Sequence, residues 1–174
     1  MFSATYFGTM ARYNRWQNRS IFGAADGIGE AARREDRGAF FRSIHETLSH
    51  LMWGDTVWMA RLDGWDMPEV GLSDSPHWVK DWDDMKARRP ELDAKLLAWS
   101  LSLEEADTEG EFAWWSDAAG REMRLPKATC MMQIFNHQTH HRGQVHAMLT
   151  AAGARPEATD LPFMPAKEFE EGET

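Results

Sequence analysis

Cysteine is nearly absent from this 174-residue sequence, because Cys130 is the only one. A single cysteine excludes an internal disulfide framework, and a reducing compartment is the simplest environment for such a chain. The N-terminus lacks the basic stretch and uninterrupted apolar run of a signal peptide. No stretch approaches the roughly 18 apolar residues of a membrane-spanning helix. We therefore expect a cytoplasmic protein that does not associate with membranes.

Basic charge is also scarce. The chain has 19 Lys and Arg against 28 Asp and Glu, which gives a formal net charge of −9. A negatively charged surface repels phosphate. The short basic stretches at 32–34 and 87–90 are too small to override that average. Nucleic acid is therefore not an expected partner.

Large apolar side chains, in contrast, are plentiful. The chain has nine Trp and eleven Met, and 43% of its residues are hydrophobic. This composition and length suffice for one domain with a sizeable core. We place that domain at residues 1–155 and a C-terminal tail at 156–174. In the tail, Leu161, Phe163 and Met164 are expected to pack in part.

Apolar residues spaced by three and four predict four long helices. The first lies at residues 4–25, and the second runs from Asp36 or Gly38 to 62. The third lies at 75–102 and the fourth at 127–152. Pro90 falls inside the third, where we expect a kink or break. Residues 111–116 and 121–126 flank the turn-like sequence DAAG and predict a β-hairpin. The expected fold is all-α: a four-helix bundle with a short hairpin before its last helix.

Four of the seven histidines fall within residues 135–146, whose sequence is FNHQTHHRGQVH. On a helix, His137 and His141 lie one turn apart within the apolar stripe. His140 falls at the margin of that stripe and His146 on another face. A spacing of i, i+4 lets two imidazoles reach one metal ion. The alternative is a pair of core histidines that hydrogen-bond to Tyr, Asp or backbone groups.

A protein metal site usually needs a third ligand. His77, beside a proline at a helix start, is expected to be a surface or capping residue. His45 and His50 lie on the second helix and flank its apolar stripe on opposite sides, so periodicity does not choose between them. Asp55 falls within that stripe. It is either a buried hydrogen-bond partner for a side chain of the first helix, such as Trp16 or Asn18, or a group that orients a ligand histidine.

Three segments of the chain resemble a known family. The segment FNHQTHHRGQVHAMLTAAG resembles the final core helix of the DinB/YfiT-like metal-binding four-helix bundles. FFRSIHETLSHLMWGDTVWMARLDG resembles the second helix of these proteins, and RYNRWQNRSIF resembles their opening helix. The resemblance runs from about residue 5 to 153. It implies an up-and-down variant of the bundle.

The resemblance also implies a divalent ion held by three histidines. One comes from the second helix and two come from the motif HxxxHRGQ, which on this chain gives His50, His137 and His141. The resemblance thus selects His50 over His45. Ser49 stands where many relatives have Asn, a departure that should alter the bonding around the site and not the ligation itself.

Some similar proteins are transferases or isomerases that use a low-molecular-weight thiol such as bacillithiol or mycothiol. The resemblance therefore implies a metalloenzyme with a small-molecule substrate, in which the ion activates a thiol. Three imidazoles suit Zn²⁺ or Ni²⁺ best, while Fe²⁺, Co²⁺ and Mn²⁺ also fit. The alternatives are a metal-dependent hydrolase, with Asp55 or Glu46 as general base, and a non-catalytic stress-response module.

Two residues beside the histidine pair and four tryptophans have open roles. We interpret Arg142 as a partner in a structural ion pair, in preference to a group that binds the carboxylate of a cosubstrate. Gln144 is interpreted either as a partner for bound water or as part of a solvated flank. The chain is expected to form a homodimer. The tryptophans that could supply its interface are Trp53, Trp58, Trp114 and Trp115.

Overall fold

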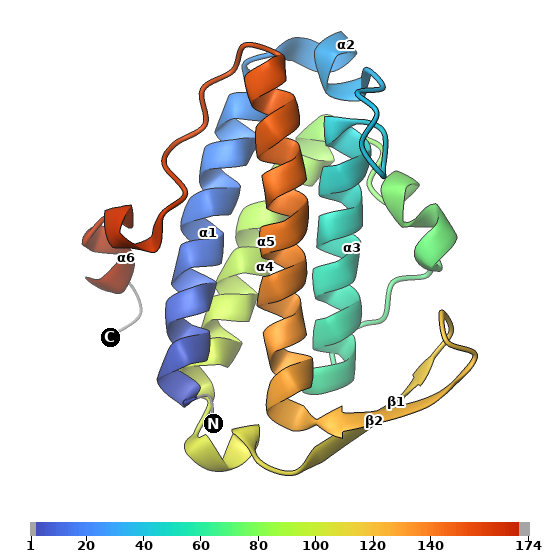
Figure 1. The fold of residues 1–174 in the computed structure, drawn as a ribbon, viewed down its shortest axis with the longest axis vertical. Coiled ribbons are helices and arrows are strands. Elements are labelled where there is room, and N and C mark those ends of the chain that lie inside the picture. The colour runs from blue at the N-terminus through green and yellow to red at the C-terminus, as the bar shows by residue number, and fades with distance from the viewer. Residues whose placement is uncertain (1–2, 171–174) are drawn as a thin grey trace.

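The computed structural model describes residues 3–170, and its dominant elements are four long helices packed side by side (Figure 1). These helices are α1 (Ala4–Asp26), α3 (Ile44–Asp63), α4 (Trp82–Ser102) and α5 (Lys127–Ala151). The shorter elements are α2 (Gly29–Arg34), the 3-10 helices η1 (Leu72–His77), η2 (Glu105–Thr108) and η3 (Leu161–Phe163), strands β1 (Glu111–Ser116) and β2 (Arg121–Pro126), and α6 (Lys167–Glu170). The expected all-α bundle with a short hairpin is confirmed.

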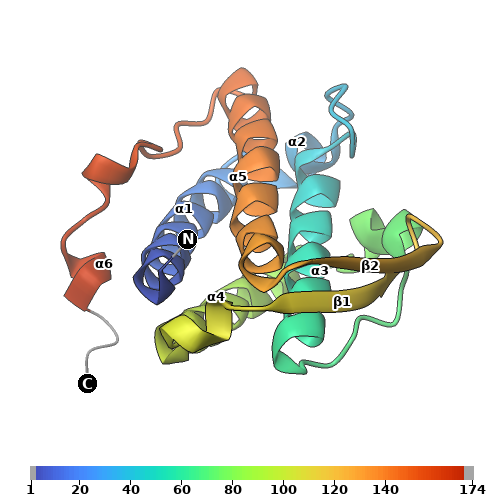
Figure 2. The same ribbon diagram turned by 60° about the horizontal axis from the view of Figure 1, so that its bottom comes forward.

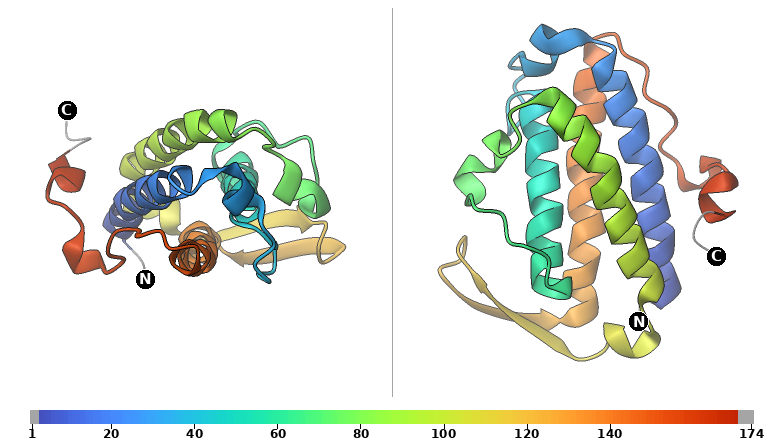
Figure 3. Two further views of the ribbon diagram at one scale, coloured as in Figure 1. Left: turned by 90° about the horizontal axis from the view of Figure 1, so that it is seen from above. Right: turned by 180° about the vertical axis from the view of Figure 1, so that it is seen from behind.

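Each long helix packs against two others. Helix α1 contacts α4 and α5, and α3 contacts α5 and α4. Helices α1 and α5 run in one direction and α3 and α4 in the other, because the segment between α3 and α4 returns along the bundle before α4 begins (Figures 1 and 3). That segment contains η1, which packs against α3. None of the described helices is both long and apolar enough to cross a membrane.

Helix α3 begins later than the apolar spacing predicts. Its N-cap is Ser43, whose hydroxyl accepts a hydrogen bond from the Glu46 backbone N–H at 3.1 Å and donates to the Glu46 carboxylate at 2.9 Å. This reciprocal capping fixes the helix start. The predicted start at Asp36 or Gly38 is therefore wrong. Phe40, expected on the buried stripe, is 80% exposed.

Helix α4 also begins later than predicted, and Pro90 does not interrupt it. The residues around Ser75 and Pro76 form η1 instead, and α4 starts at Trp82 behind the N-cap Asp81. The Asp81 carboxylate accepts a hydrogen bond from the Asp84 N–H at 2.9 Å. The helix then runs without a break through Pro90 to Ser102, so the expected break is absent.

The hairpin agrees with its prediction at every residue. Strands β1 and β2 pair antiparallel, with Glu111 opposite Pro126 and Ser116 opposite Arg121. The hairpin leads into the start of α5 and passes across α3, in front of that helix in Figure 2. Trp114 packs edge-on against Trp58 of α3, with ring centroids 5.4 Å apart.

The C-terminal segment lies along α1. Met164 is buried against Tyr13 and Trp16, while Leu161 and Phe163 are exposed, so the expected packing holds for Met164 alone. Glu168 is also buried, and its carboxylate pairs with arginines of α1. Residues 171–174 of the tail lie outside the described part of the chain.

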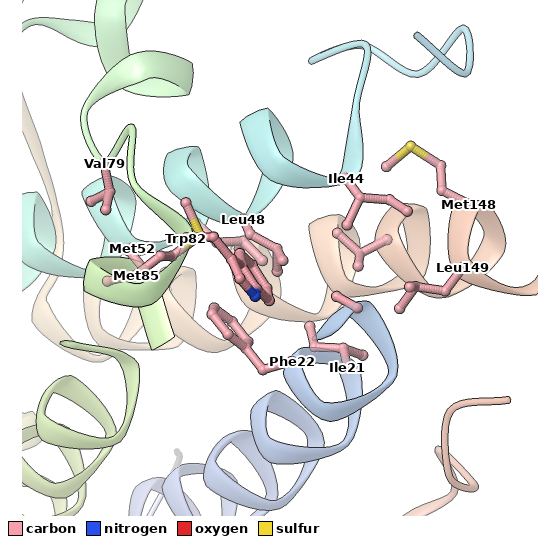
Figure 4. Packing of buried hydrophobic residues seen from close by; sticks show 13 residues of the cluster. Ile21, Phe22, Ile44, Leu48, Met52, Val79, Trp82, Met85, Met148 and Leu149 are labelled. Carbon is pink, nitrogen blue, oxygen red and sulfur yellow. The ribbon is translucent and has the colours of Figure 1, made fainter. Parts of the chain in front are cut away.

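The core of the bundle has two apolar halves. One half contains the stacked rings of Phe22 and Trp82, whose centroids are 5.5 Å apart, together with Leu48 and Met148 (Figure 4). The other half is built around Phe7, Met59, Leu96, Ile134 and Phe135.

Between the two apolar halves, each long helix contributes buried polar side chains. This polar layer consists of Asn14 and Asn18 from α1, Asp55 from α3, Arg89 and Asp93 from α4, and Gln138 and Arg142 from α5. In the sequence of every helix, these residues fall between the positions that enter the two apolar clusters. The polar layer therefore crosses the bundle near its middle.

Candidate metal centre

Three histidines from two packed helices meet beside the polar layer. His50 comes from α3, and His137 and His141 come from consecutive turns of α5. One ring nitrogen from each lies within 4.8 Å of the others, and His50 Nε2 is 3.0 Å from His137 Nε2. The structure thus brings together the three residues that the sequence selected. Nitrogen donors in this arrangement could hold a divalent ion.

Gly54 allows the two helices to approach at this point. It lies one turn after His50 on α3, and a Cβ added to it would lie 2.6 Å from His137 Cε1. Any other residue would therefore push the imidazole away. The sequence analysis overlooked Gly54. A glycine inside a helix lowers the stability of the helix by up to about 1 kcal/mol relative to alanine. A glycine in the middle of the predicted second helix was therefore the sequence signal for a close contact at this point.

Ser75 orients the His50 ring. The Ser75 hydroxyl donates its proton to the Leu72 carbonyl at 2.7 Å, so it accepts a hydrogen bond from His50 Nδ1–H at 2.8 Å. His50 Nε2 is then the nitrogen with the lone pair, and it accepts a hydrogen bond from His137 Nε2–H when no ion is bound. Ser49 supports the same segment, because its hydroxyl donates to the Ser75 carbonyl and accepts from the Val79 N–H.

Gln144 orients the His141 ring in the same way. The Gln144 side-chain oxygen accepts a hydrogen bond from His141 Nδ1–H at 2.8 Å. His141 Nε2 is left as the lone-pair nitrogen. Gln144 is half-buried and bonded to a candidate ligand, so it is more than a solvated flank. Bonds of this kind fix ring orientation and raise ligand basicity at metal sites.

Burial keeps the three imidazoles neutral. It lowers the pKa of His50 to about 3 and that of His137 to about 4, and repulsion from neighbouring imidazoles acts in the same direction. Burial also lowers the pKa of His141. Neutral rings are the form that binds a metal ion. The donor set, its protonation state and its orienting hydrogen bonds together fit a divalent ion.

The other histidines lie outside the cluster. His45 is buried, but its Nε2 hydrogen-bonds to the Val79 carbonyl at 3.0 Å on another side of α3. His140 is exposed, and its ring lies roughly perpendicular to the His141 ring. His146 is half-buried on a different face of α5, and His77 is exposed at the end of η1, as expected for a surface residue.

Asp55 belongs to the polar layer and does not contact the first-helix side chains proposed for it. Its carboxylate accepts hydrogen bonds from Arg89, at 2.7 Å, and from Gln138. Trp16 hydrogen-bonds to Glu157 instead, and Asn18 bonds to Asp93. The proposed partners were wrong because a cation from α4 takes the carboxylate.

Arg142 is also part of the polar layer, but it forms no direct ion pair. Its guanidinium donates to Gln138 Oε1 at 3.1 Å and to Asn14 Oδ1, and it lies over the Tyr13 ring. Burial lowers the Arg142 pKa to about 10. The structural interpretation therefore holds, while the expected carboxylate partner is replaced by two amide oxygens.

Two aromatic rings flank His50. The Phe41 ring stacks on His50, with centroids 3.9 Å apart, and lies 5.4 Å from the His141 ring. The Trp53 ring lies 5.8 Å from His50 and is fixed by a hydrogen bond from its Nε1 to the Val70 carbonyl. The sequence analysis missed Phe41, because it assigned that residue to a helix.

Comparison with known proteins shows similarity to one curated protein and to one family model. The chain is 23% identical over 155 residues to "Protein DinB" from Bacillus subtilis (strain 168), covering 85% of this chain and 87% of that relative. No solved structure gives a significant match. The model of the DinB family matches residues 1–173. The chain therefore belongs to the DinB family.

Proposed function

We propose that this protein is a metalloenzyme in which His50, His137 and His141 hold one divalent ion, with Zn²⁺ or Ni²⁺ favoured. We further propose that it is a thiol-dependent S-transferase or isomerase acting on a small-molecule substrate. The observation that carries this proposal is the convergence of three neutral imidazoles within 4.8 Å. Within the described residues, no carboxylate or cysteine joins this cluster. Three protein donors leave a four-coordinate ion able to accept an outside ligand.

A bound divalent ion supplies Lewis acidity, which lowers the pKa of a thiol that binds it. The chain's own residues prepare the site for this chemistry. Ser75 and Gln144 hold two imidazoles with their lone-pair nitrogens directed at the cluster. Phe41 and Trp53 line His50 with apolar surface. A dry surrounding strengthens the electrostatic effect of any ion bound there.

A hydrolase would need a general base near the ion, and both candidate carboxylates are otherwise engaged. Asp55 is buried and bonded to Arg89 and Gln138. Glu46 accepts a hydrogen bond from the Ser43 hydroxyl at the start of α3. A thiol-dependent reaction does not require either group, because the thiol itself is the nucleophile. The site geometry therefore favours the thiol-dependent reaction over hydrolysis.

A homodimer would have its best candidate contact at Trp115. This side chain is 61% exposed on the hairpin, whereas Trp58 and Trp114 pack against each other. Sedimentation velocity of the wild type and of Trp115→Ser tests this proposal. A concentration-dependent dimer that the substitution weakens would support it, and a monomer at every concentration would exclude it.

Metal content tests the site. Elemental analysis after gentle purification, or after titration with Zn²⁺ and Ni²⁺, should give about one ion per chain. His50→Ala and His137→Ala should lose the ion. The controls His45→Asn and His140→Ala should retain it, because neither ring belongs to the cluster. A wild-type protein that neither carries nor takes up stoichiometric metal would contradict the proposal.

Thiol binding tests the reaction class. Substitution with Co²⁺ makes the site visible by absorption, so bacillithiol, mycothiol and simple thiols can be titrated directly. A new sulfur-to-cobalt absorption band that is absent from His141→Ala would support the thiol-dependent reaction. No response to any thiol, together with turnover of esters or amides, would favour the hydrolase instead.

A further inference from the structure

The loop between α2 and α3 covers the three-histidine cluster. Within this Phe41 loop (residues 35–43), the Phe41 ring lies 3.9 Å from the His50 ring and 5.4 Å from the His141 ring. It therefore covers two of the three imidazoles. Its neighbour Phe40 is 80% exposed, and its ring packs edge-on against the Phe41 ring, with centroids 4.8 Å apart. Phe41 itself is half-buried.

The bonds that shape this loop are local. Arg37 N–H donates to the Arg42 carbonyl, and Arg42 N–H donates to the Ala39 carbonyl, both at 2.8 Å. The Asp36 carboxylate accepts from the Gly38 N–H at 3.0 Å and from Arg42 Nε at 2.9 Å. These Asp36 bonds are exposed, and exposed ion pairs are weak because water and salt screen them.

The backbone of the loop is also strained at one position. Arg42, directly after Phe41, has a φ of 64°, in the left-handed region that residues other than glycine rarely adopt. Phe41 and Ala39 are the half-buried residues by which the tip of the loop contacts the bundle. Few buried contacts and exposed backbone bonds are the features of segments that open locally. The tip of the loop around Phe41 can therefore leave the cluster while Ser43, which is buried, keeps the start of α3 capped.

We propose that Phe41 is a specificity-determining residue that covers the three-histidine cluster, and that the Phe41 loop must open before an outside ligand reaches the imidazoles. The size of the opening then sets which ligands enter: a small thiol needs a brief displacement of the ring, and a bulky thiol needs a larger one. The role of Phe41 in selecting thiols rests on the proposed metal function. The physical claim, that Phe41 limits access to His50 and His141, does not require a metal.

Chemical modification of histidine tests the cover in metal-free protein. Diethyl pyrocarbonate modifies accessible neutral imidazoles, and peptide mass spectrometry reports the rate at each position. Phe41→Ala should raise the rates at His50 and His141, relative to exposed His77, by about three- to tenfold, the change equivalent to an aromatic pair of about 0.5–1.5 kcal/mol. The matched control Phe163→Ala should stay within about twofold of wild type, because that ring is exposed on η3, outside the Phe41 loop.

A distant substitution tests whether the loop moves. Asp36→Ala removes the acceptor for Gly38 and Arg42 without touching the cluster, so it should also accelerate modification of His50. Circular dichroism confirms that each variant is folded. Equal rates in wild type and Phe41→Ala would overturn the assignment of Phe41 as a cover. An effect of Phe41→Ala without any effect of Asp36→Ala would overturn the opening of the loop.

Thiol size tests specificity in the Co²⁺-substituted protein. Phe41→Ala should strengthen binding of thiophenol more than binding of 2-mercaptoethanol, whereas Phe163→Ala should change neither. Equal gains for both thiols would overturn the role in specificity. If the wild type binds no metal, the proposed function fails, and the modification rates still decide whether Phe41 covers the histidines.

Discussion

Gly54 of α3 and His137 of α5 are so close that a Cβ on residue 54 would lie 2.6 Å from His137 Cε1. This contact sets how near the two helices that supply the candidate ligands can come. The metal centre therefore depends on a residue that has no side chain to contribute. The same contact gives the first of four predictions.

Gly54→Ala should weaken metal binding while leaving the bundle folded. The added methyl group must displace the His137 imidazole, and misplacing one ligand should lower metal affinity by at least about tenfold. Competition with a chromophoric chelator measures the affinity. Gly143→Ala is the matched control, because it adds the same methyl group on α5 where, apart from the adjacent part of the helix itself, no described atom lies within 4 Å. It should leave affinity unchanged and raise stability by about 0.5–1 kcal/mol.

Ser75→Ala should also weaken metal binding, through the orientation of His50. Without the hydroxyl, His50 Nδ1–H loses its acceptor, and substitutions of such partners lower metal affinity by about 10–100-fold. Ser73→Ala is the control two residues away, because that hydroxyl bonds only to the exposed carboxylate of Asp74. Unchanged affinity in Ser75→Ala would show that the ring keeps its orientation without this bond.

Acidification should destabilise the metal-free protein in the range where free histidine titrates. The folded-state pKa values of His50 and His137 lie near 3 and 4, and that of His45 is also lowered by burial, whereas unfolded histidine has a pKa of about 6.5. Below pH 6.5 the unfolded chain therefore binds more protons than the folded one. The stabilisation is complete above pH 6.5 and is lost as pH falls towards 4.

Urea unfolding of chelated protein between pH 7 and 5 measures this effect. The carboxylates of Asp26, Glu30 and Asp36, whose pKa values are lowered chiefly by hydrogen bonds, lose their contribution only below about pH 4.5. Burial raises the pKa of Asp55, which acts against the histidines, so the difference between wild type and His50→Gln isolates the histidine contribution. His50→Gln should make the free energy of unfolding fall less steeply with pH. A wild-type stability that stays constant from pH 7 to 5 would contradict the prediction.

Arg89→Met should strongly destabilise the fold. Arg89 donates to Asp55 at 2.7 Å and to Asp93 at 2.9 Å, and all three side chains are buried. Removal of the cation leaves two carboxylates buried without it, which typically costs about 3–5 kcal/mol. Arg88→Met, at the neighbouring exposed position on α4, should cost less than about 1 kcal/mol. Chemical unfolding of the two variants gives the comparison.

The elements whose bounds the sequence predicted well end at or near glycines that mark a turn. Helix α5 stops before Gly153, which has a φ of 84°, and the hairpin turns at a short segment that ends in Gly120. The start of α3 could not be read from apolar spacing, because Phe40 matches the spacing but lies on a loop. The Ser43–Glu46 capping pair was the better signal.

The candidate site was predictable only in part. Periodicity on α5 placed His137 and His141 together, but it could not choose between His45 and His50, since α3 is buried on more than one face and both rings are buried. The resemblance to the family made that choice. Ser75 contacts the cluster from the short 3-10 helix η1 and Phe41 from a loop, and the periodicity of the long helices describes neither contact.

The polar layer has a consequence for how the four helices are aligned along the bundle axis. Apolar side chains tolerate a shift between neighbouring helices, but a shift by one turn, about 5.4 Å, would separate Asp55 from both Arg89 and Gln138. These bonds therefore fix the axial register of α3 relative to α4 and α5. Because Asp55 follows Gly54 and Gln138 follows His137, the same register sets His50 opposite His137. The chain thus aligns its candidate ligands while it folds, before any ion is bound.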